Sequence, residues 1–153
     1  AEMERGAVAI YTHQVLEAHL ADLQSVRWSP AIYQPLIPKR SDVRVTVVGR
    51  KLWAAEIHSQ SDPCATVDWR RTASPDLAHS ALELPREIAE RLLALMARLR
   101  LSFGAIDLIR TPDDRYVFLE VNPSGQWMWL EQTLGFPISE AIARWLAHSG
   151  RED

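Results

Sequence analysis

The chain has 153 residues, of which 47% are hydrophobic and 24% are charged. This length and composition are typical of one globular domain, and they exclude both intrinsic disorder and two full domains. Seventeen basic residues against twenty acidic ones leave a formal net charge of -3. That balance removes the general electrostatic argument for nucleic acid or an anionic membrane as a partner, and we expect neither.

The cysteine content and the N-terminus bear on the compartment. Cys64 is the only cysteine, which excludes an internal disulfide framework and a cysteine-based zinc site and suits a reducing environment. No apolar stretch approaches the roughly 20 residues that span a bilayer. The first residues include acids and precede no apolar run, so they do not form a signal peptide. We therefore expect a cytoplasmic protein.

Two elements are predicted in the first part of the chain. Apolar residues at helical spacing predict a helix from Thr12 to Val26, with Thr12 as its N-cap. Residues 31–37 are apolar but interrupted by Pro35, which indicates either an edge strand or a connecting hinge.

The middle of the chain predicts a β-hairpin followed by a long loop. Val43–Val48 alternates as a strand does, Gly49 and Arg50 form a turn, and residues 52–58 resume as the second strand. Residues 61–80 contain two prolines with several Ser, Asp and Thr, so we expect an irregular segment there.

The remaining part predicts a second hairpin between helices. An amphipathic helix is expected from Pro85 to Arg100. Residues 103–110 and 116–121 read as strands joined by a turn at 111–114. Two helices, at 127–134 and 138–148, complete the chain. The order of elements predicts an α+β fold, an antiparallel sheet with helices packed on one face.

The second hairpin carries the candidate functional residues. Antiparallel pairing places Asp107 opposite Val121 or Glu120, and residues 120 and 122 share a face because side chains alternate. Two carboxylates and the amide oxygen of Asn122 would form an all-oxygen site suited to Mg²⁺. The alternative is that Asp107 and Glu120 are half-buried acids paired with the nearby arginines, which are Arg110 and Arg115.

These residues resemble a known family. Residues 104–108 (GAIDL) and 118–125 (FLEVNPSG) resemble the C-terminal signature of ATP-grasp ligases. Residues 33–39, 42–49 and 68–71 extend the likeness to the branch that matures ribosomal peptides into microviridin-type graspetides, and more distantly to ribosomal-protein glutamate ligases.

The resemblance implies a two-step reaction and its cofactors. In this family ATP phosphorylates a carboxylate, and an amine or hydroxyl then attacks the acyl phosphate to give an amide or an ester. By this resemblance Asp107, Glu120 and Asn122 bind the Mg²⁺ that bridges the ATP phosphates.

The resemblance also assigns roles to basic residues. Arg44 would clamp phosphate or the acyl phosphate, and its alternative is an exposed residue paired with Asp42. Arg70 and Arg71 are candidates for binding the acidic side chain of the substrate. We expect only one of them to be central, because adjacent residues on a strand point to opposite faces.

The adenine-binding segment is the last element implied. Gln34, Leu36 and Ile37 match the hinge that contacts adenine through backbone groups. Pro35 departs from the family pattern, since it has no backbone N–H to donate. Lys39 would reach a phosphate or a substrate carboxylate, and its alternative is a solvated surface lysine.

The likeness leaves part of the family's architecture unaccounted for. We expect residues 1–153 to form a C-terminal ATP-grasp subdomain, without the N-terminal pre-grasp region and the Gly-rich phosphate lid. The expected partners are therefore the missing N-terminal half and a peptide or other carboxylate substrate, and self-association into a homo-oligomer stays open. The alternative function is a non-catalytic ATP-grasp-like module that binds a nucleotide or a peptide.

Overall fold

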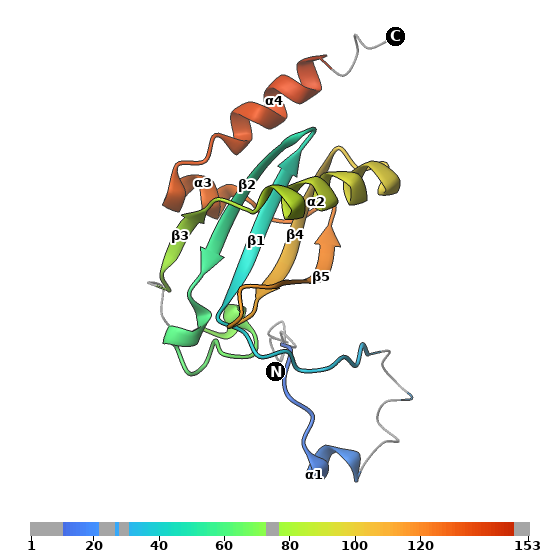
Figure 1. Ribbon diagram of the computed structural model, residues 1–153, viewed down its shortest axis with the longest axis vertical. Coiled ribbons are helices and arrows are strands. Elements are labelled where there is room, and N and C mark those ends of the chain that lie inside the picture. The colour runs from blue at the N-terminus through green and yellow to red at the C-terminus, as the bar shows by residue number, and fades with distance from the viewer. Residues whose placement is uncertain (1–10, 22–26, 28–30, 73–76, 149–153) are drawn as a thin grey trace, which may run out of the picture.

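A five-stranded antiparallel sheet is the centre of the fold. The computed structural model describes residues 11–21, 27, 31–72 and 77–148 (Figure 1). The strand order is β3-β2-β1-β4-β5. The strands are β1 (Ser41–Val48), β2 (Lys51–Ile57), β3 (His79–Leu82), β4 (Phe103–Arg110) and β5 (Tyr116–Asn122). Both predicted hairpins and the α+β class are confirmed.

Helices cover both faces of the sheet. Helix α2 (Arg86–Leu99) packs Leu92 and Met96 against the side of β1 that carries Val43, Val45 and Val47, and it crosses the near face of the sheet in Figure 1. Helices α3 (Met128–Leu134) and α4 (Ile138–His148) pack on the opposite face. The expectation that all helices lie on one face is wrong, because β1 is a central strand whose two faces both need cover.

The first predicted helix is much shorter than expected. Helix α1 covers only Glu17–Leu20 and has no buried residue. Thr12 is not its N-cap, because the helix begins at Glu17 with Leu16 in that position; the Thr12 backbone N–H donates to Asp68 Oδ2 at 3.1 Å. A helix without a packed face has little to stabilise it in water. The rest of the prediction, residues 22–26, lies outside the described part of the chain.

Residues 31–37 form no strand. They run as irregular backbone toward β1, and Ile32 and Tyr33 are 92% and 61% exposed. The hinge interpretation therefore agrees with the observed backbone, and the strand interpretation is wrong.

The expected loop at 61–80 contains more structure than predicted. Two short 3-10 helices, η2 (Ser59–Ser61) and η3 (Trp69–Arg71), lie in or next to it, and β3 begins at His79. Strand β3 pairs with residues 54–57 of β2. This short edge strand has no sequence periodicity of its own and forms because β2 offers it an open edge.

The described helices give no candidate for a membrane span, since none is both long and apolar enough.

Candidate metal and phosphate site

The predicted acidic residues come together across β4 and β5. Asp107 lies directly opposite Glu120, and the ladder then shifts so that Leu108 faces Phe118. This irregularity gives β5 one extra residue at the centre of the hairpin. Asn122 pairs with Ala105 two positions further on, on the same face as Asp107 and Glu120.

Arg44 joins this group from the neighbouring strand. It is the register partner of Asp107 across β1 and β4. Its Nε lies 2.6 Å from Asp107 Oδ1, and its Nη2 donates to Oδ2 at 3.2 Å. The two side chains are only 11% and 19% exposed. The alternative pairing of Arg44 with Asp42 is wrong, because Asp42 accepts from Lys39 instead.

The other alternative, pairing of the two acids with nearby arginines, is wrong as well. Arg110 is bound to Glu56 and Asp114, at the far end of the sheet. Arg115 is bound to Asp113 in the turn. Neither arginine compensates the acidic pair.

Burial and mutual repulsion both disfavour the charged form of Asp107 in the acidic pair, Asp107 and Glu120. Burial raises the pKa of the Asp107 carboxyl, the charge of Arg44 opposes that change, and the nearby charge of Glu120 raises it further, with a net increase. A half-buried carboxylate facing a second carboxylate is costly unless cations compensate both. This part of the sheet is therefore suited to receive positive charge.

Arg70 supplies a second cation beside the pair. It lies in η3, and its charge interacts with Asp107 and Glu120 as well as with Asp68. The hydrogen bond from Arg70 to Asp68 is the largest cause of a raised Arg70 pKa, which burial opposes. Arg71 is exposed in the same turn. Arg70 therefore interacts electrostatically with the acids while its guanidinium binds Asp68, and it lies in a 3-10 helix and not in a strand.

Asp68 holds η3 in place. Its Oδ1 accepts from the backbone N–H and from Nε of Arg70, and its Oδ2 accepts from Arg70 Nη2 and the Thr12 backbone N–H. Burial on its own would raise the pKa of the Asp68 carboxyl, but these hydrogen bonds outweigh it and lower the pKa below the ordinary 3.8.

Replacing Asp68 with asparagine should lower the free energy of unfolding at neutral pH by about 1–3 kcal/mol, because charged hydrogen bonds at a buried carboxylate are lost. Since the folded pKa lies below the unfolded one, this contribution is fully present above 3.8 and is lost as pH falls through the folded value. Urea unfolding of both proteins from pH 7 to pH 3 measures the difference. A gap that stays constant over this range would contradict the assignment, and Glu87→Gln, at an exposed carboxylate of α2 that pairs with Arg91, is the control.

An aromatic cluster lies behind Arg44. Its Cζ is 5.9 Å from the centroid of the Trp69 ring. The Trp69 ring is 5.6 Å from that of Trp129, which in turn is 5.0 Å from the ring of His79. No sequence pattern predicts this cluster, because its members come from three separate elements, η3, α3 and β3.

Lys39 is neither a surface lysine nor a free cation. Its Nζ lies 2.6 Å from Asp42 Oδ2 and donates to the Val67 carbonyl at 3.1 Å. The side chain is 6% exposed. A phosphate contact by Lys39 stays a prediction, and it requires that these bonds be exchanged.

The predicted adenine-contacting residues lie apart from the regular structure. Gln34 and Leu36 are exposed, and Ile37 is half-buried, in the irregular segment before β1. In Figure 1 this segment leads away from the end of the sheet. Their role is untested by this geometry and stays a prediction.

The donor set fits a magnesium ion. Within the described ranges no three His, Cys, Asp or Glu residues gather, so an ion here would use two carboxylates and the amide oxygen of Asn122. Asn122 Oδ1 accepts the Ser124 backbone N–H at 2.8 Å, which fixes its orientation and leaves a second lone pair. Oxygen ligands of this kind are those that Mg²⁺ prefers.

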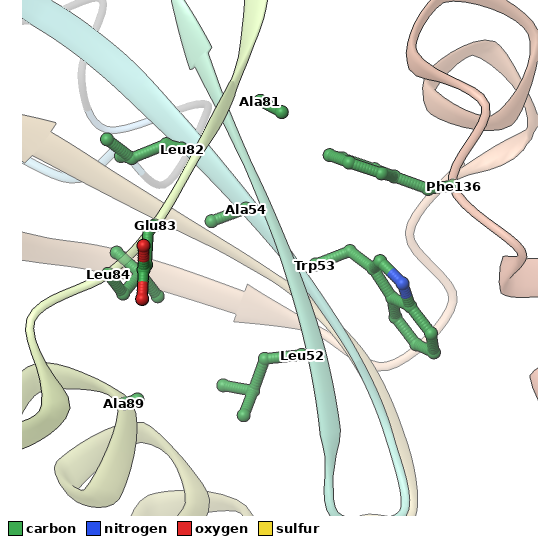
Figure 2. A pocket seen from close by; sticks show the side chains of 9 residues that line it. All are labelled: Leu52, Trp53, Ala54, Ala81, Leu82, Glu83, Leu84, Ala89 and Phe136. Atoms are coloured by element: carbon green, nitrogen blue, oxygen red, sulfur yellow. The ribbon is translucent and has the colours of Figure 1, made fainter.

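A pocket of about 520 Å³ lies elsewhere, at the outer edge of β2 (Figure 2). Figure 2 shows Trp53 and Phe136 on one side of β2 and Leu52 on the other. Glu83 is its one charged lining residue, and none of the predicted site residues line it. The pocket is therefore separate from the acidic pair.

Comparisons with known proteins identify the fold. No protein-family model matches the sequence, and no curated protein matches it. Among solved structures, macrocyclase MdnC from Microcystis aeruginosa MRC, bound with precursor peptide MdnA, is 38% identical with a TM-score of 0.81, over 97% of this chain and 46% of that one. The RiPP-associated ATP-grasp ligase of Chryseobacterium gregarium, in complex with ADP and a leader and core peptide, is 33% identical with a TM-score of 0.87, over 97% and 45%.

A third match supports the fold alone. ATP-grasp ligase PsnB, complexed with a phosphomimetic variant of its minimal precursor, Mg and ADP, is 20% identical with a TM-score of 0.68, over 90% of this chain and 43% of that one. The chain has the fold of these ATP-grasp ligases. Within them it is similar to the RiPP-associated branch, and it spans less than half the length of these matched structures.

Proposed function

We propose that this chain is the metal- and phosphate-binding part of an ATP-dependent ligase that joins a carboxylate to an amine or a hydroxyl of a peptide. The observation that carries the proposal is the Asp107–Glu120 pair, flanked by Asn122 and faced by Arg44 and Arg70. The similar ligases that hold ADP and precursor peptides support the nucleotide and the substrate class.

The chemistry follows from the charges. A carboxylate oxygen of the substrate attacks the γ-phosphorus of ATP, ADP leaves, and an acyl phosphate forms. An amine or hydroxyl then attacks the carbonyl carbon, inorganic phosphate leaves, the nucleophile loses its proton, and an amide or ester remains. Both steps concentrate negative charge, which cationic groups must offset.

Each site residue has a part in this proposal. Asp107, Glu120 and Asn122 would hold Mg²⁺, which supplies positive charge to the phosphates when it is bound. Arg44 would bind the transferred phosphoryl group through its planar fork of donors. Arg70, half-exposed beside the pair, would receive the carboxylate of the substrate.

The remainder of the nucleotide site is also part of the proposal. We place a Gly-rich lid and a pre-grasp region, N-terminal to the subdomain formed by residues 1–153, over the phosphates. The described segments before β1 carry several exposed large apolar side chains, which are available to contact that region; they are Tyr11, Val15, Leu16, Leu20, Ile32, Tyr33 and Leu36. We also place the protein in the cytoplasm, where ATP is available and the exposed free thiol of Cys64 stays reduced.

The isolated 153-residue chain should bind Mg-ATP weakly and form no product, because the proposal places further nucleotide contacts on the lid. The test incubates it with Mg-ATP and acidic peptides containing Thr, Ser and Lys, and follows ADP release and the loss of one water from the peptide by mass spectrometry. A protein that carries this chain together with the lid should release one ADP for each bond formed. Product from the isolated chain would refute the need for the lid, and peptide binding without ADP release by the longer protein would favour the non-catalytic module.

A further inference from the structure

The position that suits a metal ion already holds a positive charge. Arg44 contacts both carboxylate oxygens of Asp107, through Nε at 2.6 Å and Nη2 at 3.2 Å. Asp107 is the most enclosed of the three predicted metal ligands, since Glu120 and Asn122 are exposed. Any ion that approaches the acidic pair therefore meets a carboxylate whose two oxygens are in use.

Arg44 and a divalent ion cannot both hold Asp107 at low cost. Two cations a few ångströms apart repel each other strongly in a partly buried site, because water screens their charges less there. Glu120, directly opposite, is free to add a second carboxylate to the ion, whereas Arg44 contacts only Asp107 among the acidic pair. An ion shared by both carboxylates therefore has an electrostatic advantage over the guanidinium.

We propose that Arg44 is the counter-cation that a divalent metal ion displaces from Asp107, so that metal binding is what frees Arg44 for an anion. The inference rests on the proposed function and adds an order to it: metal first, then the arginine clamp. The Arg44 side chain is 11% exposed and lies over Trp69, so the released guanidinium stays at the site. Without the metal, Arg44 balances the charge of Asp107, and the phosphate-binding arginine is engaged.

The test measures metal affinity without any nucleotide. Mn²⁺ is titrated into the chain, and free Mn²⁺ is followed by electron paramagnetic resonance. Replacing Arg44 with glutamine should lower the Kd for Mn²⁺ by roughly 3- to 10-fold, because the competing cation is gone. Asp107→Asn should lose binding, both alone and combined with Arg44→Gln.

Two matched variants separate local competition from the loss of one positive charge. Arg91→Gln removes a charge on α2, where Arg91 pairs with Glu87, and should leave the Kd unchanged. Arg70→Gln removes a cation that is near the pair but bound to Asp68, and should have a smaller effect than Arg44→Gln. Denaturant unfolding of each variant checks that the fold is kept, and Arg44→Met, which also removes the charge, repeats the test if Arg44→Gln does not fold.

The outcomes test the displacement of Arg44 separately from the metal site itself. Mn²⁺ binding that depends on Asp107 but is unchanged or weakened in Arg44→Gln overturns the displacement and leaves the metal site standing. Absence of Mn²⁺ binding in every variant overturns the metal site, and the displacement with it.

Discussion

Replacing Glu120 with glutamine should lower kcat/KM of the ligase that contains this chain by roughly 10³-fold. Raising the Mg²⁺ concentration should not restore most of the lost activity. The carboxylate is exposed on β5 opposite Asp107, so its charge serves no packing role. A neutral amide cannot offset a divalent ion, and Asp107 with Asn122 would be left to hold it. Calorimetry of Mg-ATP binding, with steady-state rates at several Mg²⁺ concentrations, measures both parts of the loss.

The fold should not suffer from this change. Removing Glu120 also removes the like charge that raises the pKa of Asp107, so the free energy of unfolding should stay within about 0.5 kcal/mol of the parent. Glu87→Gln is the matched control, because Glu87 is exposed on α2 and pairs only with Arg91. Equal Mg-ATP affinity and equal rates in Glu120→Gln and the parent would remove Glu120 from the metal site.

The sequence was most informative where local patterns and pairing agree. Alternation, a Thr–Pro–Asp–Asp turn and the antiparallel rule were enough to place Asp107 opposite either Val121 or Glu120, and the structure pairs it with Glu120. The helix at 85–100 was predicted to within a residue or so of α2, because its apolar stripe is buried by the sheet. In each case the residues that determine the structure lie close together along the chain.

The parts that could not be predicted depend on contacts between distant segments. The Thr12 backbone N–H donates to Asp68, 56 positions away, and the helix begins only at Glu17. Lys39 reads as a surface lysine until the Val67 carbonyl is brought to it. Strand β3 forms on the open edge of β2. These features depend on tertiary contacts, so local sequence patterns do not predict them.

Pairing also decided which arginine compensates the acids. Arg110 and Arg115 lie nearest to Asp107 and Glu120 along the chain, yet they bind acids in or near the hairpin turn and on β2. Arg44 lies 63 positions from Asp107 and becomes its register partner only when β1 enters the sheet beside β4. The family resemblance pointed to Arg44 for phosphate, but the contact with Asp107 came from the fold.

Arg44→Lys should lower the rate of phosphoryl transfer by roughly 10²-fold, and Arg44→Gln by 10³-fold or more, a range set by losses of arginine contacts to a transferring phosphoryl group. Lysine keeps the charge but not the planar fork of donors, and glutamine loses both. Arg40→Gln is the matched control, since Arg40 lies just before β1 and pairs with the exposed Asp114. Single-turnover measurements, which separate chemistry from product release, should show this loss for Arg44→Gln together with the tighter Mn²⁺ binding proposed above. A merely structural role would weaken both properties together, so opposite changes in one protein would show that Arg44 serves the phosphate and yields Asp107 to the metal.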